Sequence, residues 1–252
     1  MTVSIEGKDY HDGVDLTKER FYELLTTQKE FPKTSQPSPQ EFLTYFEKVK
    51  EAGDELICFT ISSALSGTCQ SALLAKDMAD YDKIHVIDTL GVTHMIGIMV
   101  EYAAKLRSQG FTALQIVEAV EKLKPRIKVF AGVDTLEYLR KGGRLSGAAA
   151  AVGSLAQIKP IVTITEEGKV DTKGKCIGKA RAMQQIVEWV TAAEPDPAFP
   201  VLCLYSLGEE NCELLEQRLK ENAMEVSQRR QIGSTIGAHV GPGAYGVIFV
   251  TK

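Results

Sequence analysis

The sequence has no apolar run that approaches the roughly 20 residues needed to cross a bilayer. Its first residues also lack the pattern of a signal peptide. A formal net charge of −4 argues against a general nucleic-acid-binding protein, because such proteins usually present a basic face. We therefore expect no stable membrane insertion, no nucleic-acid partner and a cytoplasmic location.

Potential metal ligands are few and scattered along the chain. The five cysteines form no C-x-x-C pair, and the four histidines are far apart in sequence. We expect reduced, packed thiols and no metal site. The sequence also lacks a G-x-x-x-x-G-K-[ST] loop, a protein-kinase glycine loop and an early G-x-G-x-x-G after a strand. These absences argue against an ATP-binding enzyme and against a nucleotide-dependent dehydrogenase.

What the sequence does contain is an alternation of short β-branched runs with amphipathic segments, which is typical of an α/β protein. The predicted strands are Glu55–Ile61, Ile84–Ile87, Ile127–Val133, Pro160–Thr165, Val201–Tyr205 and Val247–Thr251. The predicted helices are Leu16–Thr27, Pro39–Glu51, Thr68–Ala79, Thr93–Ser108, Thr112–Leu123, Lys179–Ala192 and Glu209–Asn222.

The same pattern predicts two domains. The first run of strand–helix units ends near Lys124-Pro125, so we expect an N-terminal α/β domain with a parallel sheet over residues 1–124. Residues 125–252 mix hairpins with helices and predict a second α/β domain with a mixed sheet. Hairpins are expected at the start of the chain, around Glu6-Gly7-Lys8, and around Glu167-Gly168.

Three short segments are rich in hydroxyls, glycine or histidine, and each is predicted to join an extended segment to a helix. They are residues 33–38 (KTSQPS), 62–68 (SSALSGT) and 236–244 (IGAHVGPGA). Such connections present free backbone N–H groups and small polar side chains, which suit an anionic group. The sequence therefore predicts an anion-binding site built from separate parts of the chain.

Each segment also has a structural interpretation. Ser38 opens a capping box with Glu41 and needs no other role, whereas Thr34 and Ser35 lie upstream of that cap. Ser66 could bind an anion, or Ser66 or Thr68 could cap the helix that follows.

The third segment has the same two interpretations. Ser234 could cap a short helix that ends at Gly241, with His239 in its last turn and Pro242 just beyond. A lone histidine is more often structural, and the sequence does not decide whether His239 is a neutral donor or a cation.

A fourth segment, Gly142-Gly143-Arg144-Leu145-Ser146, is predicted to begin a helix that continues through Ala148–Val152. Its glycines indicate close packing. Together with the three segments above, this turn resembles the DegV family of bacterial fatty-acid-binding proteins, in the same order and over nearly the whole chain.

The resemblance implies a two-domain fold that buries a long-chain fatty acid and needs no other cofactor. It implies that the carboxylate is held by Thr34, Ser66 and His239, and that four neighbouring residues support them: Ser35, Ser62, Ser63 and Gly67. DegV-like proteins normally begin with an additional strand before the hairpin that opens this chain. The resemblance therefore implies that the usual first strand is missing from the sheet of the N-terminal domain.

The resemblance also implies a partner, a fatty acid kinase whose ATP-binding subunit phosphorylates the carried acid and so feeds phospholipid synthesis. Arg144 is the residue expected to dock that subunit. This chain would then be a lipid-binding subunit with no catalytic residue of its own, and we expect it to be a monomer.

Two other functions remain open from the residues. A serine hydrolase could act on lipid esters through Ser66 and His239, although the G-x-S-x-G elbow is absent and no acidic orienting residue can be nominated from spacing. A lipid sensor would bind fatty acid without any kinase partner.

Overall fold

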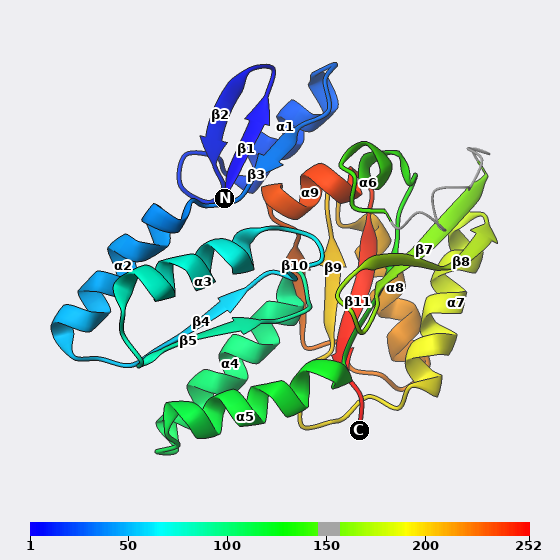
Figure 1. The fold of residues 1–252 in the computed structure, drawn as a ribbon. Helices are drawn as coiled ribbons and strands as arrows, with labels where there is room; N and C mark the ends of the chain where they lie inside the picture. Colours follow the sequence, from blue (N-terminus) through cyan, green and yellow to red (C-terminus); the bar gives the residue numbers. More distant parts are fainter. Residues whose placement is uncertain (146–156) are drawn as a thin grey trace. The chain divides into compact units, whose positions relative to one another are not determined.

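The computed structural model describes residues 1–145 and 157–252, which form two compact units (Figure 1). Unit 1 consists of Met1–Thr34, Ile127–Thr165 and Lys169–Lys252. Unit 2 consists of Ser35–Arg126 and Glu166–Gly168. Unit 1 has two sheets and unit 2 has one, and each unit has buried apolar clusters of its own.

Unit 2 is an α/β layer structure built on two parallel strands, and α2 and α3 lie on one side of this sheet with α4 and α5 on the other (Figure 1). Its elements are α2 (Pro39–Ala52), β4 (Leu56–Thr60), α3 (Thr68–Ala79), β5 (Ile84–Asp88), α4 (His94–Ser108), α5 (Ala113–Leu123) and the 3-10 turn η1 (Lys124–Arg126). Parallel strands need a crossover, and α3 supplies it between β4 and β5.

Unit 1 contains a six-stranded mixed sheet in the order β10-β9-β11-β6-β7-β8 and a small sheet in the order β2-β1-β3. Its strands are β1 (Thr2–Ile5), β2 (Lys8–His11), β3 (Lys33–Ser35), β6 (Ile127–Gly132), β7 (Ile158–Ile164), β8 (Val170–Ile177), β9 (Leu202–Tyr205), β10 (Gln228–Gln231) and β11 (Tyr245–Val250). Its helices are α1 (Lys18–Thr27), α6 (Glu137–Lys141), α7 (Lys179–Ala192), α8 (Glu210–Glu221) and α9 (Ser234–Val240). Only β9 and β10 pair in parallel among the described strands of this sheet.

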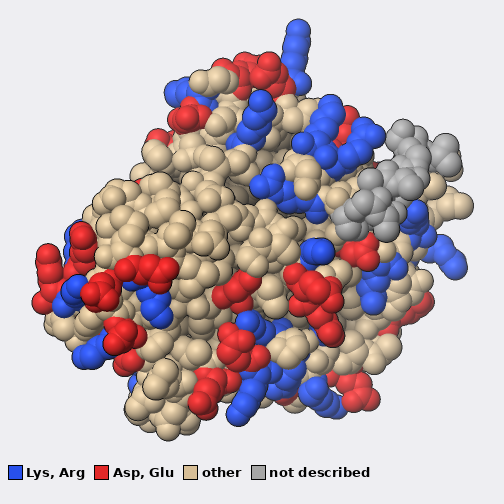
Figure 2. Space-filling view, viewed as in Figure 1, with Lys and Arg blue, Asp and Glu red and all other residues tan. Residues whose placement is uncertain are grey.

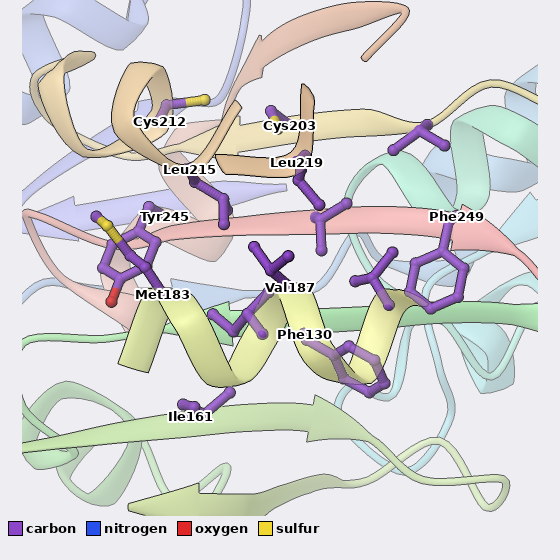
Figure 3. Close-up of a cluster of buried hydrophobic side chains, with 14 of the residues drawn as sticks. Phe130, Ile161, Met183, Val187, Cys203, Cys212, Leu215, Leu219, Tyr245 and Phe249 are labelled. Atoms are coloured by element: carbon purple, nitrogen blue, oxygen red, sulfur yellow. The ribbon is translucent and has the colours of Figure 1, made fainter. Parts of the chain in front are cut away.

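The core of unit 1 lies between the six-stranded sheet and helices α7 and α8 (Figure 3). All six residues of β11 are buried, as the unbroken apolar run Tyr245–Val250 requires of an interior strand. The Phe130 ring lies 5.6 Å from the Phe249 ring and 5.7 Å from the Trp189 ring, centroid to centroid. This cluster stabilises the six-stranded sheet, which contains β6, the strand that α6 follows in the chain.

The α/β class, the parallel sheet of unit 2 and the mixed sheet of unit 1 are as predicted from the sequence. Both hairpins are present, as β1–β2 and β7–β8. Ser38 caps α2 through the predicted capping box, with Pro39 at the first helical position. Four short elements, β3, β10, α6 and η1, were not predicted from the sequence.

The two units do not follow the sequence in the simple order of residues 1–124 and 125–252. The long segment of unit 2 ends at Arg126, but residues 1–34 belong to the same unit as most of the second half of the chain. Long-range contacts explain this arrangement, because α1 packs on α9 and the Tyr22 hydroxyl donates to the Ile232 carbonyl at 2.9 Å.

Charged side chains of both signs are interspersed over the face shown in Figure 2. Among the described residues, no helix has the length and apolar character that a membrane crossing requires.

Candidate functional site

Thr34 and His239, which are 205 positions apart in the sequence, are joined by a hydrogen bond in unit 1. The distance between the Thr34 Oγ1 and His239 Nε2 atoms is 2.9 Å, and both residues are partly buried. Thr34 is the middle residue of β3, and His239 lies in the last turn of α9. The structure thus brings together two of the three residues that the sequence predicts for an anion site.

Helix α9 is held at both ends by features that fix the position of His239. Gly241 ends the helix at φ +75°, where a side chain would be strained and where a Cβ would lie 2.4 Å from the Tyr138 ring. At the other end Gly233 is the N-cap and supplies no side-chain bond. The predicted capping role of Ser234 is therefore wrong, because Ser234 is the first residue inside the helix.

The N-terminal cap of α9 comes instead from Asp12, at the start of the chain. Its carboxylate accepts hydrogen bonds from the Ser234 hydroxyl at 2.8 Å, the Thr235 amide at 3.0 Å and the Thr235 hydroxyl at 2.5 Å. Burial alone would raise the pKa of Asp12, but the hydrogen bonds from Thr235 and Ser234 outweigh it and lower the pKa below its ordinary value. Asp12 therefore holds α9, and with it His239, as an ionised carboxylate.

Replacing Asp12 with alanine is expected to lower the free energy of unfolding by about 1–3 kcal/mol, the cost of losing a helix cap and hydrogen bonds to a charged group. Because the pKa is lowered on folding, this stabilisation is present above the ordinary aspartate pKa and is lost as the pH falls through the folded value. The difference between the two proteins should thus shrink below about pH 4. Urea unfolding at a series of pH values measures it, with Asp82→Ala at an exposed aspartate as the control.

The His239 ring is neutral near pH 7. Burial, followed by the positive charge of Arg144, lowers the pKa of His239 to about 4. Its Nδ1 atom is buried and has no hydrogen-bond partner among the described residues. Of the two possibilities left open by the sequence, the neutral form is therefore the one that the surroundings of the ring favour.

Arg144 lies beside this pair, in the segment that follows α6. Its guanidinium donates a hydrogen bond to the Gly142 carbonyl at 2.6 Å, and Gly142 is the C-cap of α6. Residues 142–145 therefore close one helix, and Ser146 and Ala148–Val152, where the next helix was predicted, lie outside the described residues. Arg144 places a positive charge close to the Thr34–His239 pair.

The serine-rich turn of unit 2 joins β4 to α3. The buried Ser62 hydroxyl donates to the Gly168 carbonyl at 2.8 Å and accepts from the Ala64 amide at 3.2 Å, so it stabilises the turn. The Ser63 amide donates to Asp88 Oδ1 at 3.1 Å while Ser63 itself is exposed. These contacts give the Ser62 side chain a structural role, whereas the Ser63 contact is made by its backbone amide.

Ser66 lies later in the same turn and is only partly buried. Its hydroxyl oxygen lies 2.8 Å from the Thr68 hydroxyl and 3.3 Å from the Thr68 amide that donates to it. Gly67 is the N-cap of α3, so neither Ser66 nor Thr68 occupies that position, and the helix has no side-chain cap bond and no acidic residue in its first turn. The N-terminal turn of α3 therefore keeps a positive partial charge near Ser66.

The remaining predicted residues, Ser35 and Gly67, add little to the Thr34–His239 pair or to the serine-rich turn. Ser35 is exposed at the end of β3. Gly67 approaches Gln36 so closely that a Cβ would lie 2.2 Å from the Gln36 amide oxygen. Thr34, His239 and Arg144 belong to unit 1, whereas Ser66 and its neighbours belong to unit 2.

The hydrogen bonds of His239 do not form a catalytic triad. Its Nε2 atom is engaged by Thr34, and no described carboxylate contacts the Nδ1 atom that an orienting acid would need. Within residues 1–145 and 157–252, no group of three or more histidine, cysteine, aspartate or glutamate side chains could hold a metal ion.

The sequence and fold identify the family. The family model described as an uncharacterised protein of the DegV family matches residues 1–252. The chain is 37% identical over 255 residues to a DegV domain-containing protein of Caldanaerobacter subterraneus subsp. tengcongensis, with 100% of this chain and 90% of the other covered. The chain belongs to the DegV family, and the resemblance seen in its sequence is confirmed.

Solved structures of the family have the same fold. A DegV family protein from Thermus thermophilus, described by its fatty acid binding, matches with a TM-score of 0.89 and 31% identity, covering 100% of this chain and 90% of that one. A stearic-acid-binding protein from Eubacterium ventriosum matches with a TM-score of 0.88 and 26% identity, covering 100% of this chain and 89% of that one.

Two residues that fix the site were not assigned that role from the sequence. Asp12 caps α9 across 222 positions, and nothing near it in the sequence indicates this partner. Gly142 was predicted to serve close packing, but the structure shows that it packs against the His239 ring itself.

Proposed function

We propose that this protein binds a long-chain fatty acid, with the carboxylate held at Thr34 and His239. The observation that carries the proposal is the 2.9 Å bond between these two side chains, in a partly buried setting beside the positive charge of Arg144. The Thr34 hydroxyl can donate a hydrogen bond to a carboxylate without bringing a full charge of its own, and His239 holds that hydroxyl in place. The fatty-acid-binding relatives support the same ligand class.

We also propose Ser66 as a hydroxyl donor to a carboxylate, on the sequence resemblance and on its surroundings within unit 2 alone. It is partly buried and lies beside the N-terminus of α3, which has no side-chain cap. A helix N-terminus favours a nearby negative charge, so the amides of this turn would support a carboxylate bound at Ser66.

Affinity and orientation have different sources in this proposal. Burying about 15 methylenes contributes on the order of 12 kcal/mol before the costs of association, at about 0.8 kcal/mol each. A hydrogen bond to a charged carboxylate contributes only about 1.5–3 kcal/mol. The acyl chain therefore supplies most of the affinity, and the polar residues fix the position of the head group.

We further propose that the bound acid is presented to the ATP-binding subunit of a fatty acid kinase, which converts it to an acyl phosphate for phospholipid synthesis. No nucleotide-binding motif is present in this sequence, so the phosphate donor would have to be bound by a partner. Arg144 is the proposed docking residue, because it combines a positive charge with a position next to the Thr34–His239 pair.

Native mass spectrometry of protein purified without added lipid tests the binding, followed by denaturing extraction of whatever is bound. We expect about one fatty acid per chain, and the extract identifies the preferred acyl length. A folded protein that carries no fatty acid and takes up none when palmitate is added would contradict the proposal. Incubation with the kinase subunit and ATP then tests the partner, and a failure to form acyl phosphate on a loaded protein would reject only that step.

A further inference from the structure

The backbone conformation of Gly142 does not require glycine, so the need for glycine comes from its surroundings. Its φ of −72° and ψ of −8° lie in the right-handed helical region, which any residue adopts. A Cβ at this position, however, would lie 2.2 Å from the Nδ1 atom and 2.9 Å from the Cε1 atom of His239. The imidazole ring occupies the space that a side chain at 142 would need.

The contact with Gly142 also determines which ring nitrogen carries the proton. Nδ1 is buried against Gly142 and has no hydrogen-bond partner among the described residues. A buried N–H without an acceptor is rarer and more costly than a buried lone pair without a donor. Since the ring is neutral, the proton lies on Nε2, and Nε2–H donates to Thr34 Oγ1 at 2.9 Å.

This arrangement leaves the Thr34 hydroxyl with one defined role. Its oxygen already accepts from His239, and the described residues offer the hydroxyl no second partner. Its proton is therefore available to a ligand, and a ligand atom that meets it must be an acceptor. An ionised carboxylate is the best such head group, because the hydrogen bond is then charge-assisted.

We propose that Gly142 is a positioning residue that seats His239 as the Nε2–H tautomer and so makes the Thr34 hydroxyl an obligate donor to an anionic head group. This inference rests on the proposed function and adds to it the way in which the site selects its ligand. A head group with no acceptor atom, such as a fatty ammonium, would leave the Thr34 proton unpaired.

The tautomer is measured directly on protein labelled with ¹⁵N-histidine, with the His239 resonances identified by their loss in His239→Ala. At pH 7 we expect Nδ1 to show the shift of an unprotonated ring nitrogen and Nε2 that of a protonated one. A protonated Nδ1 in the wild-type protein would overturn the inference.

The role of Gly142 is tested by Gly142→Ala. We expect the ring to be displaced, the tautomer signature to change, and the preference for palmitate over hexadecylamine to fall about tenfold or more. The matched control is Gly97→Ala in α4, where a Cβ would lie 3.4 Å from another imidazole nitrogen, that of His94, at ordinary contact distance. An unchanged His239 signature and unchanged preference in Gly142→Ala would reject the positioning role.

A double substitution separates this role from a general loss of stability. Gly142→Ala should lower the melting temperature more when His239 is present than in the His239→Ala background, because the closest obstacle is then gone and the contact with the Tyr138 carbonyl at 3.1 Å remains. Equal losses in both backgrounds would show that the ring is not what requires glycine. The tautomer and melting measurements need no lipid, so they decide this inference even if the purified protein fails to bind a fatty acid.

Discussion

Replacing Thr34 with valine is expected to weaken the binding of a long-chain fatty acid about 10- to 150-fold. The hydroxyl forms the hydrogen bond to His239, and the proposed site uses its proton on the carboxylate. Losing one hydrogen bond to a charged group costs about 1.5–3 kcal/mol, and about 1.4 kcal/mol corresponds to tenfold in affinity. Valine keeps the shape of threonine, so the acyl chain should still be buried. Displacement of a fluorescent fatty acid measures the change.

The control for this substitution is Thr44→Val, at an exposed position of α2 where the hydroxyl bonds only the Gln40 carbonyl of its own helix. The methyl ester of the same fatty acid is a second control, because a hydrogen bond to a neutral acceptor contributes only about 0.5–1.5 kcal/mol. If Thr34→Val weakened the binding of acid and ester by equal factors, the hydroxyl would not be recognising the charge. An unchanged affinity for the acid would remove Thr34 from the site.

The largest expected effect on stability is at Leu215 in α8. Its side chain is fully buried, at 0% exposure, in the cluster between α7, α8 and the six-stranded sheet (Figure 3). Replacing a buried leucine with alanine lowers the free energy of unfolding by about 2–5 kcal/mol. The removed atoms no longer contribute their burial, and the cavity that they leave adds a further cost. We expect a loss of this size for Leu215→Ala in urea unfolding at neutral pH.

The residue before it in the chain supplies a matched control. Leu214 has the same side chain on the same helix but is 51% exposed. Leu214→Ala should change the free energy of unfolding by no more than about 0.5 kcal/mol, as is usual for surface positions. Losses of similar size for the two substitutions would show that burial in this cluster is not the source of the effect.

The elements that the sequence predicted well share a strong periodic pattern. Helices α3 and α7 begin and end at the predicted residues, and α2 begins at the capping box of Ser38. These segments combine an apolar face with a local start or stop signal, so the information lies within a few residues of each boundary.

The elements that it missed have no such pattern. Strand β10 reads Gln-Arg-Arg-Gln at the edge of the sheet, and β3 has only three residues, Lys-Thr-Ser. An edge strand with polar side chains is formed by its backbone pairing and not by burial of an apolar face, so its sequence resembles a loop.

The candidate site was predictable only in part for a related reason. The hydroxyl-rich segment around Thr34 and the glycine-rich segment around His239 indicated an anion, and the structure brings these two residues within hydrogen-bond distance. Asp12 and Gly142 act through partners more than 90 positions away, with no local signal of their own. A contact of that kind is determined by tertiary packing, which a single sequence does not display.

The discontinuous course of unit 1 has a consequence for the order in which the protein can fold. Unit 2 draws nearly all of its residues from one stretch, Ser35–Arg126, whose contacts are local enough to form while the ribosome is still adding the rest of the chain. Helix α1, by contrast, is synthesised before its partners. The hydrogen bond from the Tyr22 hydroxyl to the Ile232 carbonyl can form only after a further 210 residues have been added. At about 5–20 residues per second, the N-terminal segment therefore spends tens of seconds without its partner. Seven of the eight buried residues in the cluster around α1 lie within residues 3–25, so during that interval it is the side of the helix facing α9 that lacks its partner.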